Sequence, residues 1–376
     1  MPRPASDQLE GTGVASRAAP QHTMRALVQD RYGSPDVLRI AHVPRPVVRT
    51  GQVLVRVEAS SVNARDWHLM RGEPKLARLL DRSAFERSGP RVKVRGTDFA
   101  GVVESVGAGV TRWRTGDAVF GEADAAIAEY VVASQDHVAA VPQRLTFEQA
   151  AAMPLAANTA LVCLRAAEAE AGERILINGA SGGVGTFAVQ LAVSMGLHVT
   201  AVCSARNVDL LRSLGAETVI DYGREDFSAS TNRFDVVLDL VGNRTLRDLL
   251  RVVSSTGTVV LSGGGVSGQG RVVGPLAMLL RGQLAARLRH LPVRIPVATP
   301  SRENLEHLSE LAGNGAVTPV VDRTYPFEAA AEAIRYLETE HARAKVVITT
   351  WARLGPPVLH QGFTGRPSRA GWRELR

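Results

Sequence analysis

The strongest chemical signal in the sequence is a glycine-rich run, NGASGGVG, at residues 178–185. It directly follows the apolar segment Ile175–Ile177 and opens a helical pattern around Phe187–Met195. Glycine lets the backbone turn sharply and approach a pyrophosphate closely, and the free N–H groups of the first helical turn attract the anion. Because a strand precedes the run and a helix follows it, the run predicts a dinucleotide site. The residues expected to hold the dinucleotide here are Gly179, Ser181, Gly182, Gly183, Val184 and Gly185.

The end of the next expected strand indicates which dinucleotide binds. A site for NAD usually carries Asp or Glu about twenty residues after the glycines, where it accepts a hydrogen bond from the ribose 2′-hydroxyl. This chain instead has CSARN at residues 203–207, and no acid follows before Asp209. Arg206 can pair with a 2′-phosphate, and Ser204 can donate a hydrogen bond to it. The sequence therefore predicts NADPH as the cofactor.

Residue patterns that would mark metal catalysis or another hydride-transfer chemistry are missing from the sequence. The two cysteines, Cys163 and Cys203, cannot complete a four-thiolate zinc site, and the nine histidines are scattered. None of the five tyrosines is followed by lysine four positions later, so a Tyr-x-x-x-Lys pair is not expected. We therefore expect no catalytic metal, and the scarcity of cysteine favours a reducing, intracellular setting.

The elements that must position these residues follow two different patterns. Short β-type segments broken by turns run through residues 24–154. Over residues 174–261 β and α patterns alternate, which predicts an α/β fold with a doubly wound parallel sheet. Two later segments, Val317–Thr324 and Lys345–Thr350, read as strands on either side of a helix near Phe327–Glu340. We expect these three elements to return to the first domain.

The net charge of +7 does not indicate nucleic-acid binding once the charges are located. From Arg353 onward five arginines stand against Glu374, so much of the excess lies in the last residues. Elsewhere the basic side chains are spread among acids, and the only lysines are Lys75, Lys93 and Lys345. We therefore expect no nucleic-acid partner.

Targeting and membrane segments are not expected either. The first 23 residues contain Asp7 and Glu10 and have no apolar core of a signal peptide. The stretch Ile175–Leu197 carries no charge, but five glycines and several polar residues interrupt it. A buried strand, turn and helix explain this stretch better than a membrane span does. We expect a cytoplasmic protein with no membrane contact.

Further motifs resemble the medium-chain dehydrogenase/reductase superfamily, specifically its zinc-independent quinone oxidoreductase branch, which is zeta-crystallin-like. The similarity covers about residues 24–350 and leaves out only the two tails. The matching pieces are SVNARD at 61–66, GTDFAG at 96–101, GDAVFG at 116–121, the glycine run, VIDY at 219–222 and HARAKVVI at 341–348.

The resemblance implies a GroES-like β-barrel catalytic domain that the C-terminal segment completes, with a Rossmann domain inserted between. The expected organisation is a disordered tail at 1–23, the GroES-like domain at 24–154, the Rossmann NADPH-binding domain at 155–290, a return to the catalytic domain at 291–351 and a disordered basic tail at 352–376. Relatives commonly form dimers through the Rossmann edge strand, here expected near Val259–Leu261, so the resemblance also implies a homodimer.

The resemblance also assigns roles to single residues. Zinc-containing relatives have a cysteine ligand where this chain has Asn63, and a His-Glu pair where it has Thr97-Asp98, which supports a metal-free site. In the quinone branch the residue matching Asn63 lies beside the nicotinamide. A tyrosine that faces substrate in some members aligns with His68. Residues matching Thr159, Ser204, Asn207 and Tyr222 line the cofactor, and Ser262 completes the expected cofactor-binding set.

The reaction expected of this set is conjugate reduction of a quinone or an α,β-unsaturated carbonyl compound. NADPH supplies the hydride, and either His68 or solvent supplies the proton. Asp66 and Asp98 are expected to anchor loops, and the segment Pro74–Lys93 to shape the substrate mouth. Two alternatives stay open: an enoyl-thioester reductase on the same scaffold, and a non-catalytic protein that binds NADPH or RNA. The only local support for RNA is the basic C-terminal tail with Trp372.

Overall fold

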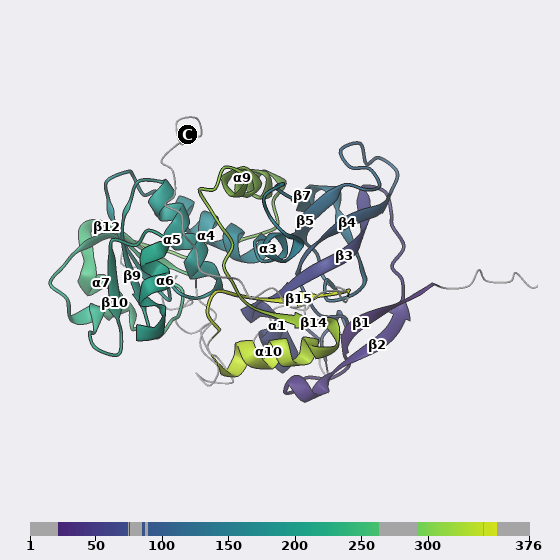
Figure 1. Ribbon diagram of the computed structural model, residues 1–376. Coiled ribbons are helices and arrows are strands. Elements are labelled where there is room, and N and C mark those ends of the chain that lie inside the picture. The colour runs from purple at the N-terminus through teal and green to yellow at the C-terminus, as the bar shows by residue number, and fades with distance from the viewer. Residues whose placement is uncertain are drawn as a thin grey trace, which may run out of the picture.

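Two domains of different architecture lie side by side in the computed structural model (Figure 1). The structure describes residues 22–73, 75, 85–86, 89–262, 292–340 and 342–351. The parallel-sheet domain lies on the left of Figure 1 and the barrel domain on the right. The α/β class, with a GroES-like domain and a Rossmann sheet, is confirmed.

The barrel domain is built around one long central strand, β3. Antiparallel β4, β6 and β15 all pair with β3, and β14 adds to β15 in parallel, which returns the end of the chain to this domain. β1 and β2 form a separate hairpin. The strands of this domain are β1 Thr23–Gln29, β2 Leu38–Pro44, β3 Gln52–Val62, β4 Asp98–Val106, β5 Ala118–Glu122, β6 Tyr130–Ser134, β7 Val138–Ala140, β14 Val321–Pro326 and β15 Lys345–Thr349.

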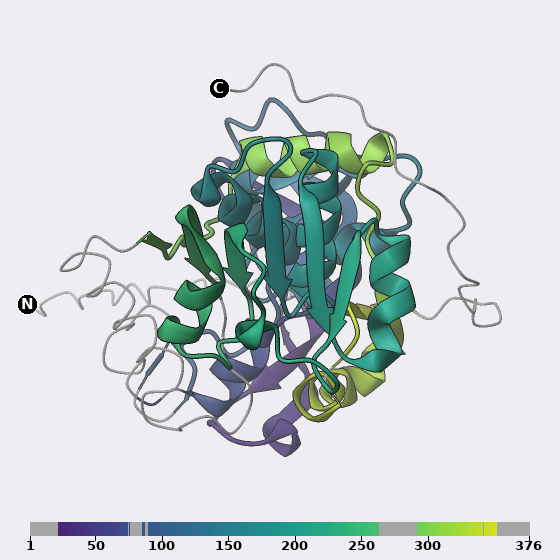
Figure 2. The same ribbon diagram turned by 90° about the vertical axis from the view of Figure 1, so that its left-hand side faces the viewer.

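The second domain holds a six-stranded parallel sheet in the order β10-β9-β8-β11-β12-β13 (Figure 2). Counted along the chain this is the order 3-2-1-4-5-6 of a Rossmann domain, whose ligand lies where the strand order reverses. The reversal falls between β8 and β11, at the carboxyl ends marked by Asn178 and Asp239. The strands are β8 Arg174–Asn178, β9 His198–Cys203, β10 Thr218–Asp221, β11 Phe234–Asp239, β12 Val253–Leu261 and β13 Val293–Arg294.

Local sequence explains where the helices begin. Thr146, Thr245 and Ser301 are N-cap residues whose side chains accept backbone N–H groups, and Pro154 stands in the first turn of α4, where it needs no donor. The helices are α1 Ala64–Arg71, α3 Phe147–Ala151, α4 Pro154–Ala167, α5 Gly183–Ser194, α6 Val208–Ser213, α7 Leu246–Val252, α9 Arg302–Gly313 and α10 Ala330–Thr339. Short 3₁₀ turns are η1 Pro35–Val37, η2 Gln135–His137, η3 Ala205–Asn207, η4 Phe227–Ala229 and η5 Phe327–Ala329.

The largest apolar core is continuous between the two domains. Leu164 of α4 and Phe187 of α5 belong to the same buried cluster as Phe120 and Ala59 of the barrel. Burying one such side chain fully contributes about 1.5–3 kcal/mol. The shared core therefore fixes how the cofactor sheet faces the barrel, and it sets the geometry of everything that lies between them.

Three details differ from the expectations from sequence. β13 pairs outside β12, so the sheet runs past residue 290 and its edge is Val293–Arg294, not Val259–Leu261. β14 begins at Val321, later than the expected strand from Val317. Thr23, expected in the N-terminal tail, already belongs to β1. The rest of that tail except His22, the tail at 352–376, the expected helix that ends near Arg289 and most of Pro74–Lys93 lie outside the described residues.

Candidate active site

The glycine run forms a turn that side chains would block. Gly179 has φ +84°, and a Cβ there would lie 2.6 Å from a methyl carbon of Val241. A Cβ at Gly185 would lie 2.2 Å from the carbonyl oxygen of Gly179. Gly182 is the N-cap of α5 and has no side chain with which to cap it. The first turn of α5 therefore keeps N–H groups that suit an anion.

The switch point of the sheet lies directly beside this turn. Asn178, the last residue of β8, donates from Nδ2 to Oδ1 of Asp239 over 2.8 Å. The same Asp239 oxygen accepts the backbone N–H groups of Val241 and Gly242, both at 3.1 Å. These bonds hold the two strand ends and the following turn in place, so the crevice has a rigid floor.

The far end of the glycine turn meets the start of β15. Ala344, with φ 56°, donates its N–H to the carbonyl oxygen of Ser181 over 2.8 Å. Lys345 follows, and its side-chain stem passes the helix start so closely that a Cβ at Gly183 would lie 3.1 Å from it. A segment more than 150 residues away in sequence therefore completes the wall of the cofactor site.

A cavity of about 490 Å³ opens at the ends of β9 and β10. Asn207 donates from Nδ2 to the hydroxyls of Ser181 (3.0 Å) and Ser204 (3.3 Å), and its Oδ1 is buried without a hydrogen-bond partner. The Arg206 guanidinium lies at the surface and donates to the backbone oxygen of Glu340 over 3.2 Å. An orphaned buried acceptor beside a guanidinium fits a phosphorylated ribose. The described lining residues are Ser181, Ser204, Ala205, Arg206, Asn207, Tyr222, Thr339 and Glu340.

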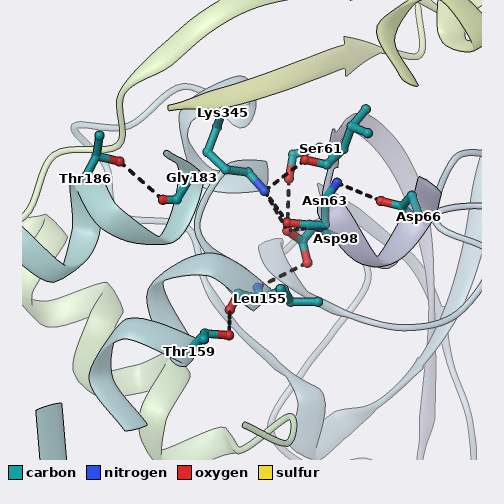
Figure 3. Close-up of polar contacts among 10 residues, drawn as sticks. Ser61, Asn63, Asp66, Asp98, Leu155, Thr159, Gly183, Thr186 and Lys345 are labelled. Carbon is teal, nitrogen blue, oxygen red and sulfur yellow. Dashed lines mark hydrogen bonds and ion pairs between the residues drawn. The ribbon is translucent and has the colours of Figure 1, made fainter. Parts of the chain in front are cut away.

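A buried polar centre lies where three strand ends converge (Figure 3). Val346 pairs with Val62, so the next residues at that end, Lys345 of β15 and Asn63 after β3, face each other. Ser61 pairs with Asp98, the first residue of β4. Strand register alone therefore brings together four polar residues from three separate segments.

Hydrogen bonds fix the orientation of every group in this centre (Figure 3). The Lys345 ammonium donates to Oδ1 of Asn63 (2.5 Å) and to the carbonyl oxygen of Val62 (3.3 Å), and it lies 3.5 Å from Oδ2 of Asp98. Asn63 Nδ2 and the Ser61 hydroxyl both donate to that carboxylate oxygen, each over 2.9 Å. The Asn63 amide is thus oriented with its oxygen toward Lys345 and its nitrogen toward Asp98.

The other carboxylate oxygen of Asp98 connects this centre to helix α4. Leu155 donates its backbone N–H to Oδ1 of Asp98 over 3.1 Å, which satisfies a free donor of the first helical turn. One turn later the Thr159 hydroxyl donates to the Leu155 carbonyl oxygen over 2.7 Å. Asp98 therefore anchors structure, as expected from sequence, and it is also the counter-ion of Lys345.

Burial perturbs the charged groups around the centre. The Lys345 side chain is only 3% exposed, and burial lowers its pKa although Asp98 and Asp66 favour the ammonium. Burial raises the pKa of Asp66 to about 6, opposed mainly by the hydrogen bond from the Asn63 N–H (2.7 Å). Burial also raises the pKa of Glu122 well above its usual value, and the charge of Asp98 adds to that effect. Such shifts are typical of functional sites.

The residues of this centre do not fit a zinc ion. At the positions where zinc-containing relatives have metal ligands, this chain has an amide (Asn63), a hydroxyl (Thr97) and one carboxylate (Asp98). The Lys345 ammonium already contacts two of these groups, and it would repel a divalent cation. The described part of the chain contains no group of three His, Cys, Asp or Glu side chains arranged to hold a metal.

The other expected site residues are placed as follows. His68 on α1 stacks on the Trp67 ring at 3.8 Å, and its Nδ1 lies 3.1 Å from the Glu73 carbonyl oxygen. Ser262 lies at the end of β12, where its N–H donates to the Asp239 carbonyl oxygen over 3.0 Å. Val184 lies in the first turn of α5, and Tyr222 is an exposed wall of the cavity. Roles for these residues stay predictions.

Sequence reasoning did not assign Lys345 to the site. The residue stood within the segment HARAKVVI that carries the family resemblance, and it is one of only three lysines in the chain. A lysine at the start of an apolar strand was the available signal, because such a position is buried and charged side chains are rarely buried unless paired.

Comparisons with known proteins give consistent results. Residues 49–143 match the family model described as alcohol dehydrogenase GroES-like domain, and residues 214–348 match the model described as zinc-binding dehydrogenase. A 2-methylene-furan-3-one reductase from Solanum lycopersicum is 33% identical over 359 residues, which cover 92% of this chain and 84% of that protein. An Arabidopsis thaliana protein named NADPH-dependent alkenal/one oxidoreductase is 32% identical, covering 89% of this chain and 82% of its own.

A solved structure agrees with these sequence relatives. The quinone oxidoreductase from Coxiella burnetii superposes with a TM-score of 0.75 at 31% identity, covering 88% of this chain and all of that one. None of the helices in the described part of this chain has the length and apolar character that a bilayer-spanning helix needs.

Proposed function

The chain belongs to the medium-chain dehydrogenase/reductase superfamily, in the branch of the quinone oxidoreductases, and it is an oxidoreductase; we propose that it reduces quinones or α,β-unsaturated carbonyl compounds with NADPH and without zinc. One observation carries the proposal. Ser181 of the glycine turn lines the cavity at Arg206 and accepts the N–H of Ala344, and the next residue, Lys345, contacts Asn63 and Asp98 at positions where zinc-containing relatives have ligands.

The cofactor would be held along this path. Arg206 and the Ser204 hydroxyl bind the 2′-phosphate, while the first turn of α5 binds the pyrophosphate. The orphaned oxygen of Asn207 accepts a hydroxyl of the ribose. Asn63 and Thr159 would hold the nicotinamide end. When bound, NADPH supplies a hydride, and the protein supplies position and electrostatics.

The polar centre prepares the reacting end of the site. The Asn63 amide oxygen accepts a hydrogen bond from Lys345, and one amide hydrogen is donated to Asp98. The second amide hydrogen can therefore be donated to a carbonyl oxygen of cofactor or substrate. The positive charge of Lys345, fixed before substrate arrives, stabilises negative charge that develops on that oxygen. The same residues thus take over part of the polarising role of a metal. The proton comes from His68 or from solvent.

The proposal also covers the setting of the protein. We propose that it acts as a homodimer, which the family resemblance supports, and in the reducing setting of the cytoplasm, which suits its two free cysteines. Light scattering of the purified protein would give the mass of the assembly, and a monomer at micromolar concentration would contradict the dimer.

A substrate panel tests the activity directly. Purified protein is expected to oxidise NADPH in the presence of 1,4-quinones or alkyl enones, with NADH much less effective and with no loss of activity after chelator treatment. A crotonyl thioester in the same panel tests the enoyl-thioester alternative. Chelator-sensitive oxidation of simple alcohols would contradict the proposal. NADPH binding without turnover of any substrate would favour a binding protein instead.

A further inference from the structure

Arg95 is a buried cation without an ion-pair partner among the residues that the structure describes. It precedes β4, it is 3% exposed, and two backbone hydrogen bonds of 2.9 Å, with Leu27 and Ile127, hold its main chain. Its Nε is buried without a hydrogen-bond partner. Within the described residues no carboxylate lies within 4 Å of its guanidinium nitrogens. A guanidinium carries five donors, so leaving it buried and unpaired is unfavourable unless something else satisfies it.

The charged groups nearest to Arg95 do not neutralise it fully. Asp66 and Asp124 attract it from beyond ion-pair distance, whereas Arg65 repels it. Asp66 is already engaged as the acceptor of the Asn63 N–H, and Asp124 lies 3.7 Å from Arg65 with both of these side chains about half exposed. Burial lowers the pKa of Arg95, which indicates how poorly the charge is compensated.

Arg95 is one of the residues that line a pocket of about 120 Å³. Arg65 and Asp124 stand on its polar side, and Leu69, Val92 and Val94 supply an apolar side. This volume is several times what one water molecule needs. The lining thus combines two arginines, one exposed aspartate and three apolar side chains.

The pocket also adjoins the reaction centre along the chain. Arg65 follows Asn63 by two residues at the start of α1, and Arg95 precedes Asp98 by three residues at the start of β4. Asp66 accepts the N–H of Asn63, whose side chain contacts Lys345, and its charge also attracts Arg95. A group bound at Arg95 would therefore lie beside the substrate's reactive end.

We infer that this pocket binds one oxyanion, a carboxylate or a phosphate, and that its source is an acidic group on the substrate. The part about the substrate rests on the proposed function, whereas binding of the anion itself does not. A planar guanidinium binds such a group in a bidentate manner, and Arg65 closes the mouth over it. The apolar wall carries the chain that connects the acid to the reacting double bond.

The first experiment measures binding without any reaction. Thermal unfolding of the full chain is followed at constant ionic strength with increasing phosphate or acetate, against chloride. The wild type is expected to show a saturable rise in Tm, and Arg95→Met to show none. Arg224→Gln, an exposed arginine in the other domain, is the matched control and should respond like the wild type. Arg65→Met, at the half-exposed position, should weaken the response and serves if Arg95→Met fails to fold.

The second experiment compares two enones of equal length, one neutral and one ending in a carboxylate. The ratio of their kcat/KM values cancels any general loss of activity. Arg95→Met is expected to lower the acid-to-neutral ratio at least tenfold. If Arg95→Met loses the Tm response but keeps the acid-to-neutral ratio of the wild type, the pocket is an oxyanion site for a free ion. Equal saturable Tm responses in wild type and Arg95→Met would overturn the inference. So would a wild type without a saturable Tm response, if Arg95→Met also leaves the acid-to-neutral ratio unchanged. Anion binding without turnover of either enone would refute only the proposed function.

Discussion

Removing the Lys345 ammonium tests the polar centre most directly. In Lys345→Met the Asp98 carboxylate keeps its bonds from Ser61, Asn63 and Leu155 but loses its counter-ion. At 3.5 Å and an effective dielectric constant of about 20, the Coulomb energy of the pair is about 5 kcal/mol. The cost of desolvating the lysine offsets part of this energy, because burial lowers its pKa. We therefore expect a coupling between Lys345 and Asp98 of about 2–4 kcal/mol.

A double-mutant cycle measures that coupling. Lys345→Met, Asp98→Asn and the double variant are unfolded with urea, and the three changes in the free energy of unfolding give the interaction term. Lys93→Met is the matched control, because its ammonium lies 3.4 Å from Asp30 but is 69% exposed. The control should change stability by about 0.5 kcal/mol or less. A coupling below about 0.5 kcal/mol in the buried pair would refute the role given to Lys345.

The same variant has a kinetic consequence. Without Lys345 the Asn63 amide loses its fixed orientation and the site loses its charge, so kcat/KM should fall about 10²-fold. A primary isotope effect measured with NADPH deuterated at C4 should grow, since hydride transfer then limits the rate. An unchanged kcat/KM in a well-folded variant would show that the network serves only structure.

Three further predictions concern Arg206 in the cofactor cavity, Asp66 beside the polar centre and His68 on α1. Arg206→Gln should reduce the preference for NADPH over NADH by about 10–100-fold, measured as a ratio of kcat/KM values, because it removes a charge-assisted contact to the 2′-phosphate. Burial raises the pKa of Asp66 from 3.8 to about 6. The contribution of the protonated Asp66 carboxyl to the free energy of unfolding is therefore fully present below pH 4 and is lost as the pH rises through 6. Across that pH range the free energy of unfolding of Asp66→Asn should therefore rise by about 3 kcal/mol relative to the wild type, measured with urea. A difference between the two proteins that stays constant with pH would contradict the assignment. If His68 supplies the proton, His68→Gln lowers kcat/KM about 10²-fold and changes its pH profile, whereas an unchanged profile assigns the proton to solvent.

The cofactor half of the site could be predicted from sequence because its signals are local. The glycine run, the strand before it and the helix after it lie within about twenty residues, and the tightest steric limit, between a Cβ at Gly185 and the carbonyl oxygen of Gly179, is set within the run itself. The missing acid and the presence of Arg206 at the end of β9 are equally local. Such features need no knowledge of the tertiary structure, since strand, turn and helix form one unit.

The polar centre around Lys345 could not be predicted in the same way. Lys345 meets Asn63 only because β15 pairs with β3 in one register, and Ser61 meets Asp98 only because β4 pairs with β3 in another. A shift of one residue in either pairing would place these side chains on the opposite face of the sheet. No local pattern encodes that register. For the same reason Arg95 reads in the sequence as one more arginine, and only its burial distinguishes it.

The start of β15 connects the two halves of the mechanism. Ala344 is bonded to the glycine turn, and the next residue carries the ammonium that orients Asn63. A single peptide unit therefore connects the glycine turn to Lys345. The carboxylate of Asp98, fixed by α4 from the other side, limits how far the ammonium can move. This arrangement makes the orientation of the Asn63 amide depend on contacts at the start of β15 that also bind the glycine turn, and in the proposed reaction those contacts would align hydride donor and acceptor without a metal.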